Sequence, residues 1–137
     1  MGSPALDYDS RKGLIEICEL VETIERPIEM VWSVISAFGA IKTWMPGIET
    51  CYVREDKPQP PTYGATRAVA NLGIVMEETL EIWDLKEHFI SYRLQDGGPW
   101  PIKGCRGSIR LRKLDADKTE VTWRADAAEV SSEAIAD

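Results

Sequence analysis

The feature that most constrains the fold is a run of strand-like segments that fills the chain after residue 47. These segments are rich in β-branched and aromatic residues, and short stretches with Pro, Gly or Asp separate them. Consecutive strands joined by short turns pair in the antiparallel manner. The predicted strands are Ile48–Glu55, Ala65–Asn71, Val75–Asp84, Phe89–Gln95, Gly107–Leu114 and Thr119–Ala127.

One strand and two short helices are predicted before this run. Residues Ile15–Arg26 are β-prone and alternate in polarity, which indicates a strand with a bulge near its middle. Pro27 suits the first position of a helix, where its missing N–H costs nothing. Apolar residues then follow at helical spacing as far as Ile35, and Gly39 is a plausible stop. A second short helix is expected at about Ala40–Trp44.

Strands that are segregated from helices along the chain predict an α+β fold with a meandering antiparallel sheet. A length of 137 residues fits a single domain spanning residues 1–137. Residues 1–13 are expected to form a disordered tail. The last residues, Ser131–Asp137, are expected to open a C-terminal helix that is short or truncated.

Charge and cysteine content limit the class of partner. A net charge of −7 without a cluster of Lys and Arg disfavours nucleic acid. No stretch of about eighteen apolar residues is present, so we expect no membrane span. One histidine and no close cysteine pair argue against zinc, and we expect neither a metal nor a cofactor. The three well-separated cysteines, Cys18, Cys51 and Cys105, indicate free thiols and a cytoplasmic location.

Alternation along Val75–Asp84 identifies the side chains that face the interior, because a strand sends successive side chains to opposite sides. Met76, Leu80 and Ile82 form the apolar set, and Glu78 lies on the same side. An acidic side chain inside an apolar wall is the most informative feature of the chain. It predicts either a buried ion pair or a functional carboxylate.

The same argument predicts a mostly apolar inner wall with a few polar points. Glu49, Arg67, Asn71 and Tyr92 join Glu78 as these points, and such a surface is typical of a small-molecule site. Trp100 is interpreted as either a lid over the pocket mouth or a loop anchor. The other candidate ligand contacts are Trp44, Val69, Met76, Leu80, Ile90, Leu94, Cys105, Ile109 and Trp123.

Glu78, Glu49 and Tyr92 are the candidate catalytic residues. Desolvation raises the pKa of a carboxyl group by up to ~3–5 units unless a cation offsets it. A protonated Glu78 beside an ionised Glu49 would be able to enolise a ketone, close a ring or expel water, with Tyr92 holding the carbonyl oxygen. Three alternatives stay open. In the first, Glu78 forms a structural ion pair with Arg67. In the second, Glu78 contacts a ligand without chemistry. In the third, Glu49 is exposed at the start of its strand and has no role in the pocket.

Several short fragments fall in an order and spacing that resemble a known fold. The fragments are Glu25–Trp32, Trp44–Ile48, Gly64–Arg67, Glu78–Leu80, Ser91–Tyr92 and Val121–Trp123. Together they cover roughly Leu20 to Ala125. They resemble the START-like, birch-pollen-allergen-like helix-grip superfamily, and in particular its polyketide cyclase/dehydrase-like branch.

The resemblance implies a curved seven-stranded sheet that grips a C-terminal helix, with a ligand cavity between them. Members of the superfamily carry a longer helix after the last strand than this chain does. The chain is therefore cut short, or its cavity is partly open, or another subunit covers it in a homodimer. Abscisic acid receptors share the fold, but Asn71–Val75 stands at their gate and Glu49 at the lysine that binds the hormone. A receptor of that type is disfavoured.

The expected function is binding of a hydrophobic small molecule in an apolar cavity, with cyclisation or dehydration of that molecule as the favoured, cofactor-independent reaction. One alternative is a carrier or sensor of a lipid, sterol or aromatic metabolite, without catalysis. Another is an interaction domain whose groove receives a partner's helix. One fold hosts many activities, so the choice depends on the site itself.

Overall fold

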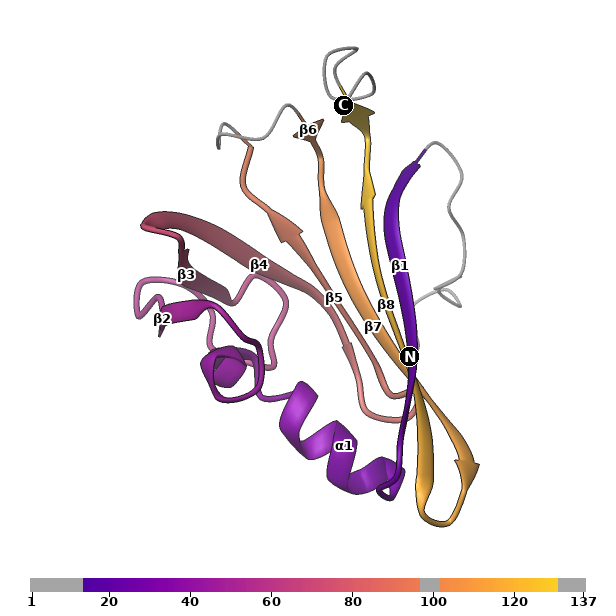
Figure 1. Cartoon of the computed structure of the whole chain (residues 1–137). Helices are drawn as coiled ribbons and strands as arrows, with labels where there is room; N and C mark the ends of the chain where they lie inside the picture. Colours follow the sequence, from indigo (N-terminus) through magenta and orange to yellow (C-terminus); the bar gives the residue numbers. More distant parts are fainter. Residues whose placement is uncertain (1–13, 97–101, 131–137) are drawn as a thin grey trace, which may run out of the picture.

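In the computed structural model, residues 14–96 and 102–130 are described, and they form a seven-stranded antiparallel sheet with two short helices (Figure 1). The strands are β1 (Ile15–Ile24), β2 (Ile48–Val53), β3 (Thr66–Asn71), β4 (Ile74–Asp84), β5 (Phe89–Leu94), β7 (Arg106–Asp115) and β8 (Lys118–Ala127). Their order in the sheet is β1-β8-β7-β5-β4-β3-β2. The predicted α+β fold is confirmed. The predicted tail at 1–13 and the predicted C-terminal helix lie outside the described residues.

The predicted strands agree with the observed ones to within two residues at every end. The bulge in β1 lies between Glu16 and Cys18, nearer the start of the strand than expected. Sequence reasoning missed a second sheet, a ribbon formed by β6 (Ile102–Lys103) and β9 (Glu129–Val130). Strands of two residues carry no alternation from which they could be predicted.

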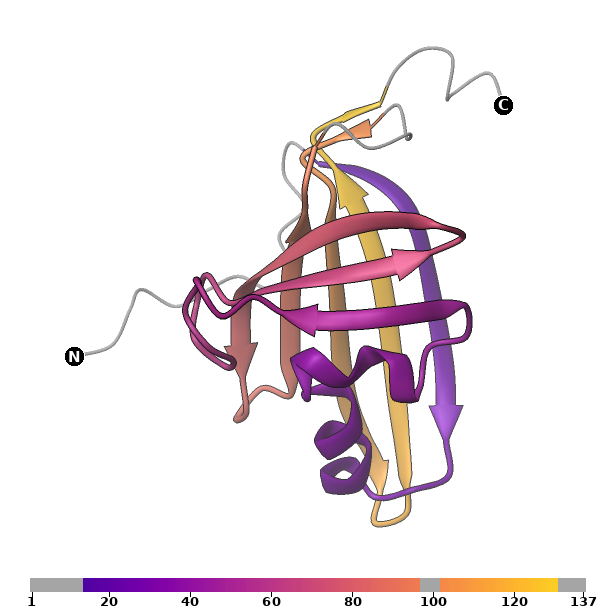
Figure 2. The same ribbon diagram turned by 90° about the vertical axis from the view of Figure 1, so that its left-hand side faces the viewer.

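The two helices follow β1 and lie on the inner side of the curved sheet (Figure 2). Helix α1 spans Ile28–Ile35, and Pro27 is its N-cap rather than its first residue. The second helix, η1, is a 3-10 helix over Phe38–Thr43 with a kink at Ala40, so it starts earlier than predicted. Within the described part of the chain, neither helix is long and apolar enough to cross a membrane.

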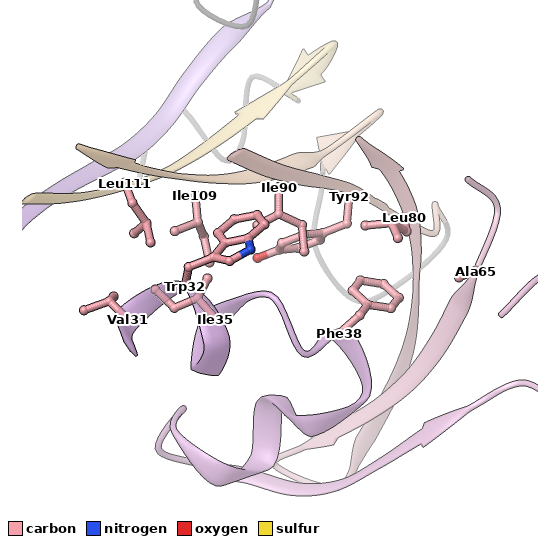
Figure 3. Close-up of a cluster of buried hydrophobic side chains, with 10 residues drawn as sticks. All are labelled: Val31, Trp32, Ile35, Phe38, Ala65, Leu80, Ile90, Tyr92, Ile109 and Leu111. Atoms are coloured by element: carbon pink, nitrogen blue, oxygen red, sulfur yellow. The ribbon is translucent and has the colours of Figure 1, made fainter. Parts of the chain in front are cut away.

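The core lies between α1 and the sheet, as Figure 3 shows with Trp32 and Ile35 facing Ile90, Ile109 and Leu111. Each large apolar side chain that is fully buried stabilises the fold by about 1.5–3 kcal/mol. The helices therefore cover one end of the concave face of the sheet. The buried cluster comprises Val31, Trp32, Ile35, Phe38, Ala65, Leu80, Ile90, Tyr92, Ile109 and Leu111.

On the opposite, convex face, Arg124 connects the outer strand β1 to β8. Every residue of β1 is exposed, so the strand gains little from burial. Nε of Arg124 donates to Asp126 at 2.7 Å, and Nη1 donates to Glu16 at 2.6 Å and to Glu19 at 3.1 Å. One buried guanidinium thus holds carboxylates from both strands, which anchors β1 to the sheet.

Candidate functional site

The candidate site lies on the concave face, where three neighbouring strands bring polar side chains together. The register places Arg67 of β3 opposite Glu78 of β4, and Glu78 opposite Leu94 of β5. Tyr92 is two residues from Leu94 on β5 and lies opposite Gly107 of β7. Residues that oppose one another across strands share a face of the sheet. The arginine, the glutamate and the tyrosine therefore point to the same side.

Arg67 and Glu78 form a buried ion pair. Arg67 is 4% exposed and the Glu78 side chain is 13% exposed. Nε of Arg67 donates to Oε1 of Glu78 at 2.8 Å, and Nη2 lies 2.7 Å from the same oxygen. Nη1 donates to the carbonyl oxygen of Phe38 at 2.7 Å. Pairing offsets the large desolvation cost of both charges. The ion pair that the sequence left as one alternative is therefore present.

Two aromatic rings pack against the guanidinium of Arg67. Its central carbon lies 4.1 Å from the centre of the Phe38 ring and 4.8 Å from that of the Tyr92 ring. Cations over aromatic faces are attracted by the ring quadrupole, more strongly when water is excluded. Arg67 thus connects β3, β4 and the first residue of η1, and it shapes the site by holding these elements in place.

Tyr92 is buried and its ring lies beside Ile90 and Leu80 (Figure 3). A Cβ atom built on Gly107 would overlap this ring, so a residue without a side chain is needed beneath it. Burial raises the pKa of Tyr92 to about 12, and the negative charge of Glu78 adds to the rise. Arg67 acts in the opposite direction. The Tyr92 hydroxyl therefore keeps its proton at neutral pH.

Beyond the helix-covered core, the concave face carries apolar side chains that are only partly buried. Trp44, at the end of η1, packs edge-on against Trp123 of β8 with 5.9 Å between ring centres. Leu20 lies opposite Trp123 on β1 and is 55% exposed. These residues and the ion pair make up what we call the inner surface. It consists of Leu20, Trp44, Arg67, Met76, Glu78, Tyr92, Leu94 and Trp123.

Most of the predicted site residues are buried or half-buried near this surface. Those that are buried are Arg67, Val69, Leu80, Ile90, Tyr92, Cys105 and Ile109. Those that are half-buried are Trp44, Met76, Glu78, Leu94 and Trp123. Trp100 lies outside the described residues. The folded sheet therefore brings most of the apolar side chains that strand alternation predicted close to the inner surface.

The predicted inner position of Glu49 is corrected by the structure, whereas Asn71 keeps the face of Arg67 and Val69 in the register of β3 against β4. Glu49 is exposed, and its Oε1 accepts the backbone N–H of Gly73 at 2.7 Å. The register of β2 against β3 shifts between Ile48 and Thr50, so Glu49 is the extra residue of a bulge and the alternation breaks there. Asn71 is exposed at the end of β3. Glu49 therefore does not join Glu78 in an acid–base pair.

Sequence reasoning missed three residues that shape the site. Phe38 supplies both a ring and a carbonyl oxygen to Arg67, and it continues the helical spacing three residues after Ile35. Gly107 makes room for Tyr92, and a glycine inside a strand often marks such a close approach. Leu20 belongs to the site because β1 pairs with β8 and places Leu20 opposite Trp123. The sequence does not show that these two strands pair.

The three cysteines are free thiols. Burial raises the pKa of Cys51 and of Cys105. The charge of Arg67 partly offsets the rise at Cys51, and the charge of Glu78 adds to the rise at both thiols. Because a thiol with a raised pKa is a poor nucleophile, neither side chain is suited to covalent catalysis. Among the residues that the structure describes, no group of three His, Cys, Asp or Glu side chains could hold a metal ion.

Two surface hollows are lined entirely by described residues. One, of about 430 Å³, lies between the α1–η1 junction and the loop at Pro60 and Pro61. The other, of about 400 Å³, lies beside the start of α1 and includes His88. Neither is lined by a residue of the inner surface, although Phe38, which packs against Arg67, lines the first.

Comparison with known families supports the resemblance stated above. The family model described as polyketide cyclase / dehydrase and lipid transport matches residues 18–136. An abscisic acid receptor from Arabidopsis thaliana is 28% identical over 99 residues, which cover 72% of this chain and 54% of the receptor. The chain thus spans about half the length of the receptor it matches.

Several solved structures share the fold. A protein from Thermobifida fusca is 24% identical with a TM-score of 0.75, covering 89% of this chain and 77% of that one. An aromatase/cyclase from Streptomyces is 20% identical with a TM-score of 0.67, covering 88% and 72%. Norcoclaurine synthase from Thalictrum flavum is 15% identical with a TM-score of 0.71, covering 90% and 80%. At these identities the likeness concerns the fold alone.

Proposed function

The chain belongs to the polyketide cyclase / dehydrase and lipid transport family, and from this premise we propose that it binds a hydrophobic small molecule on its inner surface. The observation that carries the proposal is the partial exposure of Leu20, Trp44 and Trp123 on the concave face. An apolar ligand that removes such side chains from water gains about 25 cal/mol for each Å² buried. Exposed apolar side chains that gather around a few polar groups suit that kind of ligand.

The first candidate role is that of a carrier or sensor. Acid–base catalysis of cyclisation or dehydration generally uses two groups whose protonation states differ. Within residues 14–96 and 102–130, Glu78 has no second carboxylate beside it on the concave face, and its Oε1 is occupied by Arg67. These features support binding without chemistry, in which the ion pair fixes the polar end of the ligand.

Cyclisation or dehydration is the second candidate, and one observation favours it. The charge of Glu78 acts on Tyr92, so a phenol that keeps its proton lies near a carboxylate. A phenol in such a position is able to hydrogen-bond the carbonyl oxygen of an enolisable substrate. Turnover of an identified substrate that is unchanged in Glu78→Gln would eliminate this role.

The binding proposal is tested with a matched pair of variants on β1. Leu20 and Val21 are 55% and 53% exposed, but they lie on opposite faces of the strand. The wild-type protein is titrated with N-phenylnaphthylamine, a neutral dye that fluoresces in apolar surroundings. We expect Leu20→Arg to weaken dye binding at least about tenfold, because a charge then stands on the apolar surface. Val21→Arg should leave it unchanged.

Two results would contradict the proposal. One is a wild-type protein that gives no saturable dye binding. The other is an equal loss of binding in the two variants, which would place the dye elsewhere on the molecule. Native mass spectrometry of the purified protein gives a second measurement, because a retained ligand adds its mass to that of the chain. The same spectrum tests the homodimer, which the sequence left as one of three alternatives.

A further inference from the structure

The geometry points to a ligand that presents a hydrogen-bond donor, a hydroxyl or an amine, to the carboxylate of Glu78, and that carries no carboxylate at that end. The inference rests on the proposed function, because it concerns the ligand of the inner surface. It narrows the ligand class from any hydrophobic molecule to hydrophobic molecules whose end beside Glu78 is neutral or cationic.

The first step is that Arg67 is not available to an acidic ligand. Its Nε donates to Glu78 at 2.8 Å, its Nη1 donates to the carbonyl oxygen of Phe38 at 2.7 Å, and its Nη2 lies 2.7 Å from Oε1 of Glu78 in the ion pair. The rings of Phe38 and Tyr92 pack against the guanidinium. With only 4% of the residue exposed, no ligand carboxylate reaches it in the bidentate way that arginine usually offers.

The second step is that Glu78 still has an acceptor to offer. Both nitrogens of Arg67 reach Oε1, and within the described part of the chain no hydrogen bond to Oε2 is formed. The side chain is 13% exposed, more than its arginine partner. An ionised carboxylate has two oxygens that only accept hydrogen bonds. A ligand group that meets Oε2 must therefore donate.

The third step concerns charge near the pair. The concave-facing residues of β3, β4 and β5, as the strand register defines them, include no cation besides Arg67. The charge of Glu78 raises the pKa of Tyr92 more than Arg67 lowers it, and it also raises the pKa of Cys105. At Cys51, on β2, Arg67 instead lowers the pKa more than Glu78 raises it, so the charge of Glu78 dominates on the β5 side of the pair. A ligand carboxylate is repelled there, whereas an ammonium or hydroxyl group is attracted.

The test uses four compounds with one skeleton and different end groups. These are naphthylethylamine, naphthylethanol, ethylnaphthalene and naphthylacetic acid, and each competes with N-phenylnaphthylamine at neutral pH. We expect the amine and the alcohol to displace the dye at concentrations at least about tenfold lower than the acid, since hydrogen bonds to a charged group are the stronger kind.

Two variants on adjacent positions of β4 identify the responsible carboxylate. In Glu78→Gln the advantage of the amine over the acid should shrink at least about fivefold. Glu77→Gln is the matched control, because Glu77 lies on the other face and is bound by Arg54. It should leave the order of the compounds unchanged. If Glu78→Gln does not fold, the double variant Arg67→Met with Glu78→Leu removes both charges, and the amine and the acid should then bind equally.

The outcomes separate this inference from the proposed function. An acid that binds the wild-type protein as tightly as the amine would overturn the inference, and so would equal behaviour of Glu78→Gln and Glu77→Gln. In either case ethylnaphthalene would still bind. If neither ethylnaphthalene nor the dye binds at all, the proposed function itself fails.

Discussion

Two arginines are buried on opposite faces of the same sheet, and their surroundings differ. Arg67, on the concave face, has one counter-ion, Glu78, and also donates to a backbone carbonyl of η1. Arg124, on the convex face, is 7% exposed and is surrounded by carboxylates. The carboxylates are Glu16, Glu19 and Asp126.

The difference shows how far each arginine depends on a single carboxylate. On the convex face the acidic groups exceed the cation, so the loss of one of them leaves Arg124 paired. On the concave face the charge of Arg67 is balanced by a single residue among those described, Glu78. Glu78 is also one of the polar residues of the inner surface. Stability and the proposed ligand contact therefore both involve Glu78, whereas the Arg124 cluster joins β1 to β8.

The largest expected effect comes from Arg67→Met. It leaves Glu78 half-buried without a counter-ion and removes the bond to the Phe38 carbonyl, so the free energy of unfolding should fall by about 3–5 kcal/mol. Urea unfolding measures the loss. The double variant with Glu78→Leu should recover much of it, because an apolar pair replaces the ion pair. A loss below about 1 kcal/mol would mean that the pair is freely solvated.

A smaller effect is expected when a carboxylate is removed from each arginine. Glu78→Gln should cost about 2–3 kcal/mol, since Arg67 loses the one counter-ion that residues 14–96 and 102–130 give it. Glu19→Gln should cost about 0–1 kcal/mol, because Arg124 keeps two other carboxylates and Glu19 is partly exposed. Chemical denaturation of the two variants side by side measures this. Equal losses would remove the contrast between the faces.

The pH dependence of stability reports on the concave side through Tyr92. Its pKa is about 12 in the folded state, against about 10 in an unfolded chain. Above pH ~10 the unfolded chain releases this proton while the folded one keeps it, so stability falls as pH rises from ~10 to ~12, by about 2–3 kcal/mol. Denaturation midpoints measured across that range should fall less in Tyr92→Phe. An identical fall in the variant would assign the effect to other groups.

The smallest effect is expected for Glu16→Gln on the convex face. The Glu16 side chain is 52% exposed, and water screens its attraction to Arg124. The free energy of unfolding should therefore change by less than about 1 kcal/mol. Thermal denaturation suffices to detect a larger change. A cost that matches Glu78→Gln would show that the Arg124 cluster also depends on a single carboxylate.

Local patterns were enough to predict most of the fold. Pro27, the apolar spacing that follows it and the alternation in each strand depend on neighbours in sequence, and the structure confirms the elements they predict. The position of the Glu78 side chain on the apolar face of its strand was predicted in the same way. Its partnership with Arg67 was one of the alternatives, because both residues lie in adjacent strands of the meander.

Features that depend on irregular backbone or distant contacts could not be predicted. A bulge of one residue takes Glu49 out of the alternation of β2, and nothing in the residues around it marks the bulge. The hydrogen bond from Arg67 to the Phe38 carbonyl joins positions 29 residues apart. Because every residue has a backbone carbonyl, the sequence does not show which one accepts this bond. The exposure of Leu20 depends on what covers β1, which is again a tertiary property.

The absence of a side chain at Gly107 makes two positions interdependent. Since any Cβ atom there would overlap the Tyr92 ring, a larger residue at 107 requires a smaller one at 92. Among relatives we expect the two positions to covary, with the sum of their volumes nearly constant. Protein engineers who wish to accept bulkier ligands would then shorten Tyr92 first and keep the glycine, because Tyr92 is the side chain that fills the space beside it.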